Sequence, residues 1–143
     1  MEPVEGGKTY MNILTLDHAS LLVRDVNRSR QFYCHVLGME EIPSGGNCWL
    51  RRASAEIHLL SEPEQGDAPQ SNASRYPQDA LADGYVTHIA FEVDDLDAAQ
   101  RHLKNHHVQI VCGPRPRWNG GEQLYFCDPD GYVIELFVRK ADV

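Results

Sequence analysis

The chain has 143 residues, 42% of them hydrophobic and 24% charged, which is the size and composition of one compact domain with its own core. Lys and Arg number 13 against 21 Asp and Glu, and the net charge of -8 disfavours contact with the phosphate backbone of nucleic acids. No apolar run approaches the roughly 20 residues of a membrane span, so we expect neither nucleic acid nor membrane as a partner.

Residues 1–12 contain no basic segment that leads into a long apolar core, so they do not resemble a secretory signal. We expect a flexible tail there and a cytoplasmic location. The cysteines are far apart in the sequence and form no C-x-x-C pair, which favours reduced thiols over disulfides and excludes a zinc knuckle. They are Cys34, Cys48, Cys112 and Cys127.

The segment "LDHASLLVRD" begins as a strand and ends at Asp25, whose carboxylate suits the N-cap of a helix. After it, apolar residues and one serine recur at helical spacing, and Gly38 is a plausible end of the helix. The stripe consists of Val26, Ser29, Phe32, Tyr33, Val36 and Leu37.

Farther along, "WLRRASAEIHLL" has the pattern of a strand, a tight turn and a second strand. Ile57 and Leu59 form the apolar face of the second strand, and His58 points the other way. Residues 63–85 are polar and rich in Pro, Ser and Asn, and they are longer than an ordinary structureless loop. This segment is a linker, or a lid over a site.

"VTHIAFEVDD" then predicts another strand, with His88 on the face that its apolar residues do not use. Asp95 is the matching N-cap, and Leu96, Ala99 and Leu103 predict an amphipathic helix. Near the end of the chain, "DPDG" is a strong turn signal, and Glu135 points away from the apolar face of the strand that follows it.

The chain repeats itself. His18 aligns with His88, and Asp25 with Asp95, at a constant offset of 70, and a second alignment sets His58 opposite Glu135. A strand, a helix and further strands, repeated twice, predict an α+β domain with helices over one face of each sheet. We place the first module at residues 13–62 and the second at 86–140.

His18, His58, His88 and Glu135 share the other face, and imidazole and carboxylate are the groups that bind a borderline divalent cation. The sequence does not distinguish Zn, Ni, Mn and Fe. A single strand histidine is more often a structural residue, but four positions that match between the repeats favour a metal site.

Two further clusters contain side chains that could bind a ligand. His102 and His106 are four residues apart on the second helix, yet the apolar stripe lies elsewhere, which favours a solvated face. Arg115, Arg117 and Trp118 fall in "GPRPRWNGG", which either grips an anionic or planar substrate or is an exposed loop.

Through "LDHASLLVRDVNRSRQFYCHVLGM", "EIHLL", "THIAFEV" and "DPDGYVIEL", about residues 13 to 140, the chain resembles the vicinal oxygen chelate superfamily. This superfamily includes glyoxalase I, extradiol dioxygenases, fosfomycin-resistance thiol transferases and bleomycin-binding proteins. The resemblance implies two βαβββ modules whose curled mixed sheets form a cleft around a metal, helices on the outer face, and often a homodimer.

Carried over residue by residue, His18, His88 and Glu135 resemble the metal ligands, and His58 falls where glyoxalase I has a carboxylate. This leaves Glu135 as the candidate base. Leu22 and Glu62 stand where glyoxalase I tends to hold glutathione, so a glutathione adduct is not expected.

The leading hypothesis is therefore a metal-dependent, glyoxalase I-like lyase or isomerase acting on a small oxygenated metabolite. An Fe(II) extradiol-type dioxygenase is an alternative. Another is a fosfomycin-type thiol transferase, whose hydroxyl residue two positions after the first ligand is matched by Ser20. A drug-binding protein without catalysis is a further alternative, although the retained ligands argue against it.

Overall fold

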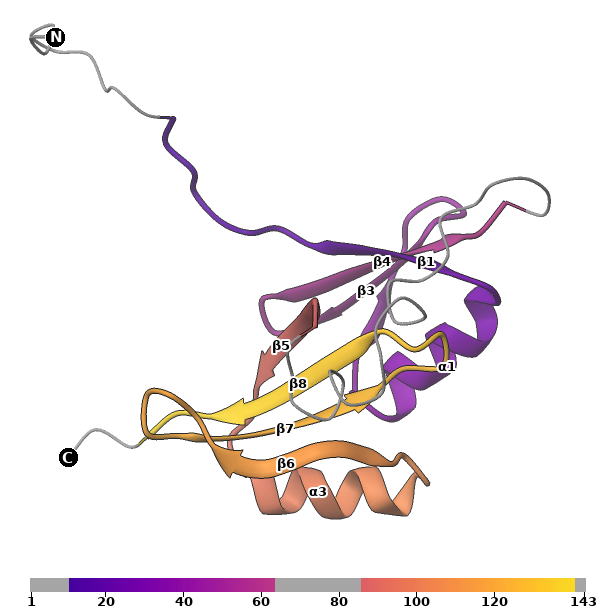
Figure 1. Ribbon diagram of the computed structural model, residues 1–143. Helices are drawn as coiled ribbons and strands as arrows, with labels where there is room; N and C mark the ends of the chain where they lie inside the picture. Colours follow the sequence, from indigo (N-terminus) through magenta and orange to yellow (C-terminus); the bar gives the residue numbers. More distant parts are fainter. Residues whose placement is uncertain (1–10, 64–85, 141–143) are drawn as a thin grey trace, which may run out of the picture.

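The computed structural model describes residues 11–63 and 86–140, and within them the chain forms two modules of the same plan (Figure 1). The elements of the first module are β1 (Ala19–Val23), α1 (Val26–His35), β2 (Glu40–Ile42), β3 (Cys48–Arg52) and β4 (Ala55–Ser61). Those of the second are β5 (His88–Glu92), α3 (Leu96–Asn105), β6 (Ile110–Pro116), β7 (Glu122–Cys127) and β8 (Val133–Val138). The predicted repeat is confirmed.

Each module has one four-stranded mixed sheet, in the order β1-β4-β3-β2 or β5-β8-β7-β6. The first strand of each module pairs in parallel with the last, and the remaining pairs are antiparallel. The described part of the chain therefore has the α+β fold of two βαβββ modules, without a closed barrel. Among these residues β1 pairs only with β4 and β5 only with β8, so each sheet has an edge formed by its first strand.

Both helices begin as the sequence predicts. The carboxylate of Asp25 accepts a hydrogen bond from the Arg28 amide at 3.1 Å, and that of Asp95 from the Ala98 amide at 2.9 Å. Each cap satisfies one of the amide hydrogens that the first turn of a helix leaves without a partner. After α1, Gly38 adopts a φ of +69°, a left-handed conformation that suits glycine where the chain leaves the helix.

One hydrophobic core joins the modules. α1 packs against β3 and β4, and α3 packs against β8. The helices contribute Tyr33, Leu96 and Leu103, and the strands contribute their predicted apolar faces. On the strands, the buried members are Leu21, Val23, Cys48, Leu50, Ile57, Leu59, Leu124, Phe126, Ile134 and Leu136. Because side chains alternate along a strand, the other face of each sheet points away from this shared core.

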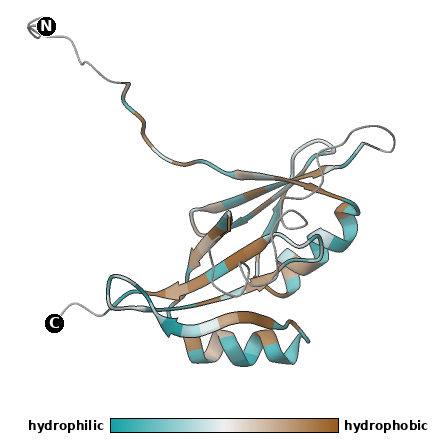
Figure 2. Cartoon of the chain, viewed as in Figure 1, coloured by the Kyte–Doolittle hydropathy of each residue, from teal (hydrophilic) through white to brown (hydrophobic). Residues whose placement is uncertain are grey.

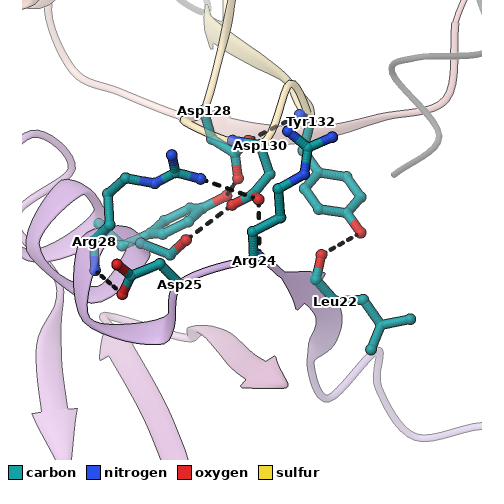
Figure 3. Close-up of polar contacts among 9 residues, drawn as sticks. Leu22, Arg24, Asp25, Arg28, Asp128, Asp130 and Tyr132 are labelled. Carbon is teal, nitrogen blue, oxygen red and sulfur yellow. Dashed lines mark hydrogen bonds and ion pairs between the residues drawn. The ribbon is translucent and has the colours of Figure 1, made fainter. Parts of the chain in front are cut away.

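The turn between β7 and β8 locks the second module onto the first (Figure 3). The buried carboxylate of Asp130 accepts hydrogen bonds from the Ser29 hydroxyl at 3.0 Å and the Arg24 amide at 3.0 Å. Asp128, also buried, accepts one from the Tyr33 hydroxyl at 2.7 Å. We call Ser29, Tyr33, Asp128 and Asp130 the intermodule latch.

Residues 11–18 precede β1 without joining a sheet, and they extend away from the body of the molecule (Figure 1). Hydrophobic residues follow one another in this segment, seen as brown in Figure 2. Most of the linker or lid predicted at 63–85, and residues 1–10 of the tail predicted at 1–12, lie outside the described residues. Within those described ranges no helix is long and apolar enough to span a bilayer.

Candidate metal-binding half-sites

The first half-site, His18, Trp49 and His58, lies on the face of the first sheet opposite the core. In the strand register His58 is the neighbour of Trp49 on β3, and their rings stack at a centroid distance of 4.1 Å and an angle of 9°. The ring of His18 meets the edge of Trp49 at 4.5 Å and lies 6.2 Å from the ring of His58. The flat indole therefore holds both imidazoles in place.

Both imidazoles of this half-site keep a nitrogen available. Nδ1 of His18 lies 2.7 Å from the carboxylate of Asp17, which accepts its hydrogen and leaves Nε2 as a lone-pair donor. Nε2 of His58 is buried and has no hydrogen-bond partner among the described residues. A buried polar atom without a partner is costly, and a cation that accepts its lone pair would remove that cost.

The second half-site is His88, Tyr125, Arg117 and Glu135, on the corresponding face of the second sheet. Glu135 is Tyr125's neighbour on the adjacent strand, and both are buried. Nε2 of His88 lies 3.0 Å from Oε2 of Glu135, and the His88 ring meets Tyr125 edge-on at 5.2 Å. Burial, together with the Glu135 charge, raises the pKa of the Tyr125 phenol, so its hydroxyl keeps its proton at neutral pH.

The tautomer of His88 is fixed by the backbone. Nδ1 lies 2.7 Å from the Val86 carbonyl oxygen, which can only accept, so Nδ1 carries the hydrogen. In the neutral ring Nε2 then carries a lone pair that points at the Glu135 carboxylate. Two electron-rich groups at 3.0 Å fit a shared cation, and a backbone carbonyl behind Nδ1 is the usual support for a metal-binding histidine.

Two arginines border the second half-site, one at Glu135 and one at Tyr125. Nε of Arg117 donates to its Oε1 at 3.3 Å, and the Arg117 guanidinium lies over the Phe137 ring at 3.9 Å. The Arg115 guanidinium lies 5.7 Å from the centre of the Tyr125 ring. Within residues 113–121, predicted to grip a substrate or to form an exposed loop, Arg117 contacts the candidate site. Trp118 of the same segment is 89% exposed.

The four predicted ligands thus form two pairs. The structure brings His18 near His58, and His88 against Glu135. It does not bring the pairs together: within residues 11–63 and 86–140 of one chain, no three His, Cys, Asp or Glu side chains form a group that could hold a metal. The pairs lie on separate sheets, on faces turned away from the common core.

Sequence reasoning missed Asp17, Trp49 and Tyr125, and it left Arg117 open. Trp49 and Tyr125 had a usable signal, since both alternate with core residues of their strands. An aromatic side chain on the non-core face, next to a candidate ligand, suggests a wall of a binding site.

A duplicated βαβββ fold with histidines and a carboxylate on the faces opposite the core defines a class of proteins that hold small ligands on their sheets. The chain belongs to the glyoxalase/bleomycin resistance protein/dioxygenase superfamily, whose model matches residues 15–136.

Two relatives show how diverse this family is. Glyoxylase I 4 of Arabidopsis thaliana is 32% identical over 134 residues, which cover 88% of this chain and 71% of that protein. Metallothiol transferase FosB of Staphylococcus epidermidis is 34% identical over 130 residues, covering 88% and 82%. The same chain is therefore similar to proteins named for different reactions.

A solved structure agrees with the fold. A mutant of the fosfomycin resistance protein FosX of Listeria monocytogenes, in complex with Mn(II) and 1S,2S-dihydroxypropylphosphonic acid, superposes with a TM-score of 0.66 at 26% identity. The superposition covers 90% of this chain and 93% of that one.

Proposed function

We propose that the protein is a metal-dependent, glyoxalase I-like enzyme that acts on a small oxygenated metabolite. Its donors are His18 and His58 from one chain of a homodimer, and His88 and Glu135 from the other. The observation that carries this proposal is the geometry of His88, whose Nδ1 is tied to a backbone carbonyl while its Nε2 lone pair faces a buried carboxylate.

The donor set fits a divalent cation of the borderline class, Zn, Ni, Mn or Fe. When bound, such an ion supplies Lewis-acid stabilisation of the negative charge that develops on substrate oxygens. The donors separate into two unlike pairs, so a two-fold dimer that joins the pair of one chain to the opposite pair of its partner contains two equivalent centres.

The remaining chemistry comes from side chains of the second half-site. Glu135 is the candidate base, because its carboxylate faces this site. It can take a proton from a carbon atom of the substrate and return it. Arg117 orients Glu135 through its Nε–H, and the Phe137 ring fixes the guanidinium. Tyr125, which remains protonated, closes the side of the site next to His88.

A second candidate function is attack on a fosfomycin-like phosphonate. The Arg115 and Arg117 guanidiniums lie beside the second half-site and are suited to an anionic group. Ser20, the β1 neighbour of His58, adds a hydroxyl on the first half-site. The similarity to FosB and FosX supports this candidate.

Metal titration tests the proposal. Protein freed of metal by chelation is titrated with Mn²⁺, Ni²⁺ and Zn²⁺ in a calorimeter, beside His88→Ala and the control His106→Ala, which alters an exposed histidine at the C-cap of α3. We expect one metal per chain in the wild type and in the control, and an affinity loss of more than about 100-fold in His88→Ala. Equal affinities in all three proteins would contradict the proposal.

Product analysis separates the two candidates. The metal-loaded protein is incubated in D₂O with small α-hydroxycarbonyl compounds, and proton exchange at the carbon next to the carbonyl is followed by NMR. Exchange that disappears in Glu135→Gln supports the glyoxalase-type reaction. Consumption of fosfomycin in the presence of a thiol or of water alone, without such exchange, favours the second candidate.

A further inference from the structure

Glu135 holds a negative charge in a buried position, and Arg117 supplies its countercharge. Its Oε1 accepts a hydrogen bond from Nε of Arg117 at 3.3 Å, and its Oε2 lies 3.0 Å from Nε2 of His88. In the tautomer set by the Val86 carbonyl, Nε2 of His88 carries a lone pair and no hydrogen. The contact with His88 therefore does not stabilise the negative charge, whereas the contact with Arg117 does.

The guanidinium of Arg117 has hydrogen-bonding capacity that this contact does not use. A guanidinium carries five N–H groups, and Nε–H is the one that donates to Glu135. The other hydrogens belong to the two Nη atoms, whose planar fork matches the oxygens of a carboxylate, phosphate or phosphonate. Among the residues that the structure describes, the Arg117 side chain forms an ion pair with Glu135 and a ring contact with Phe137. Its Nη fork is thus a donor for an anion beside the second half-site.

The backbone that carries Arg117 is fixed, and its side chain rests on an aromatic ring. The Arg117 amide donates to the Gly121 carbonyl at 2.7 Å, and the Gly120 amide donates to the Arg117 carbonyl at 3.0 Å. A Cβ at Gly121 would lie 2.0 Å from the Val138 carbonyl oxygen, so this turn packs directly on β8. The guanidinium lies over the Phe137 ring at 3.9 Å. The ring attracts the guanidinium through its face, and this contact does not involve the N–H groups at its edge.

A divalent cation at Glu135 changes the balance of charge around Arg117. The carboxylate and the guanidinium together carry no net charge, so a divalent ion held by the carboxylate and by neutral imidazoles leaves two positive charges in surplus. The ion also repels the guanidinium, because like charges interact strongly where water is excluded. An anionic ligand beside them removes the surplus and gives the guanidinium a new partner.

We propose that Arg117 exchanges partners: it neutralises Glu135 in the metal-free protein, and it binds an anionic group of the substrate when a divalent cation takes the carboxylate. This step rests on the proposed function and names its substrate class. The small oxygenated metabolite carries a carboxylate, phosphate or phosphonate group. Arg117 then couples the two binding events, so that cation and anion raise each other's affinity by the same factor.

Arg139 provides a matched control on the same ring. Its guanidinium lies 5.4 Å from the centre of the Phe137 ring, and its Nε donates to Glu92. At least half of each of these two charged side chains is exposed. Arg139→Gln therefore removes the same charge from the neighbourhood of Phe137 without removing a contact of Glu135.

The first experiment measures the coupling by calorimetry. Mn²⁺ is titrated into metal-free wild type, Arg117→Gln and Arg139→Gln, each alone and with glycolate, methylphosphonate or the neutral compound hydroxyacetone. We expect at least one of the anions, which identifies the anionic group, to tighten Mn²⁺ binding at least about tenfold in the wild type and in Arg139→Gln, and less than about threefold in Arg117→Gln. Hydroxyacetone should act equally on all three proteins.

The same titrations contain the results that would overturn the proposal. These are an anion effect of equal size in Arg117→Gln and the wild type, no anion effect in the wild type, or an effect of hydroxyacetone that depends on Arg117. Without an added anion, Arg117→Gln should bind Mn²⁺ more tightly than the wild type, because no guanidinium competes for the carboxylate. Weaker binding by a folded Arg117→Gln would also contradict the partner exchange.

The second experiment follows Arg117 in the wild type, so it does not depend on the stability of a variant. The Nε–H signals of the arginines are recorded by proton–nitrogen correlation NMR, and those of Arg117 and Arg139 are assigned by their loss in Arg117→Lys and Arg139→Lys. We expect the Arg117 signal to shift with Zn²⁺ and to shift again with the effective anion, while the Arg139 signal stays in place. Zn²⁺ binding that leaves the Arg117 signal unchanged overturns the partner exchange.

This proposal and the proposed function fail differently. If Mn²⁺ binds and the anion effect does not depend on Arg117, the partner exchange fails and the metal function stands. If the anion effect depends on Arg117 but Glu135→Gln leaves the proton exchange in D₂O unchanged, the partner exchange stands and the glyoxalase-type reaction fails. A wild type that binds neither Mn²⁺ nor Zn²⁺ overturns both.

Discussion

Asp128 offers a sharp test of how the latch stabilises the fold. Burial raises the pKa of its carboxyl to about 6, even though hydrogen bonds from the Tyr33 hydroxyl and from the backbone N–H groups of Tyr132 and Asp130 act to lower it. Burial therefore destabilises the charged carboxylate by more than these hydrogen bonds stabilise it. We choose Asp128→Asn as the perturbation, because the amide is neutral at every pH and its oxygen accepts from the same backbone groups.

The direction in which stability changes with pH follows from the difference in proton binding between the folded and unfolded states. The carboxyl titrates near 3.8 in the unfolded chain and at about 6 in the folded one. The folded state therefore binds more protons between these values, and the contribution of Asp128 to stability is fully present below about pH 4 and is lost as the pH rises through 6. A pKa difference of about 2 corresponds to about 3 kcal/mol across this window.

Urea unfolding followed by tryptophan fluorescence measures the effect, at one fixed protein concentration so that any self-association contributes equally to both proteins. Subtracting the variant from the wild type at each pH removes the titration of all other groups. We expect the wild type to lose about 2 kcal/mol relative to Asp128→Asn between about pH 4.5 and pH 8, the rest of the effect falling below pH 4.5. Tyr33→Phe removes a hydrogen-bond donor to Asp128, so the free energy of unfolding should fall more steeply with pH in this variant than in the wild type. A wild-type-minus-variant difference that stays flat over this range would refute the reasoning.

Other residues give simpler predictions of urea stability. Leu103→Ala empties a position in the shared core that is 1% exposed and should cost about 2–5 kcal/mol; a loss below about 1 kcal/mol would contradict its burial. Ser29→Ala leaves the buried Asp130 carboxylate without one donor at 3.0 Å and should cost about 1–3 kcal/mol, whereas a neutral result would mean that this bond adds nothing. Asp95→Ala removes the cap of α3 and should cost about 1 kcal/mol, largely restored by Asp95→Ser.

Local periodicity predicted the elements because each rule acts over a few residues. Alternation set His88 apart from Ile89 and Phe91, and both of these pack against the core as expected. Asp25 and Asp95 were recognisable as caps because a cap needs only its own side chain and the amide three residues later. These features do not depend on what the rest of the chain does.

The latch was not predictable in the same way. "DPDG" was interpreted as a turn, which is correct, but its carboxylates bind Tyr33 and Ser29, whose positions are 95 and 101 residues away in sequence. No periodicity connects such partners. Ser29 did give a signal, since a serine in a buried helical stripe needs a hydrogen-bond partner from another element.

The spatial arrangement of the four candidate ligands was the feature least predictable from the sequence. The shared hydrophobic core explains this arrangement. The apolar faces of both sheets belong to one core, so alternation turns both donor faces outward from it. The latch fixes this arrangement by tying the β7–β8 turn to α1. A chain built in this way cannot close its donor pairs on each other without giving up the core that joins its modules. Under the proposed function a second copy of the chain therefore brings His88 to His18, because the core that stabilises one chain keeps its own two donor pairs apart.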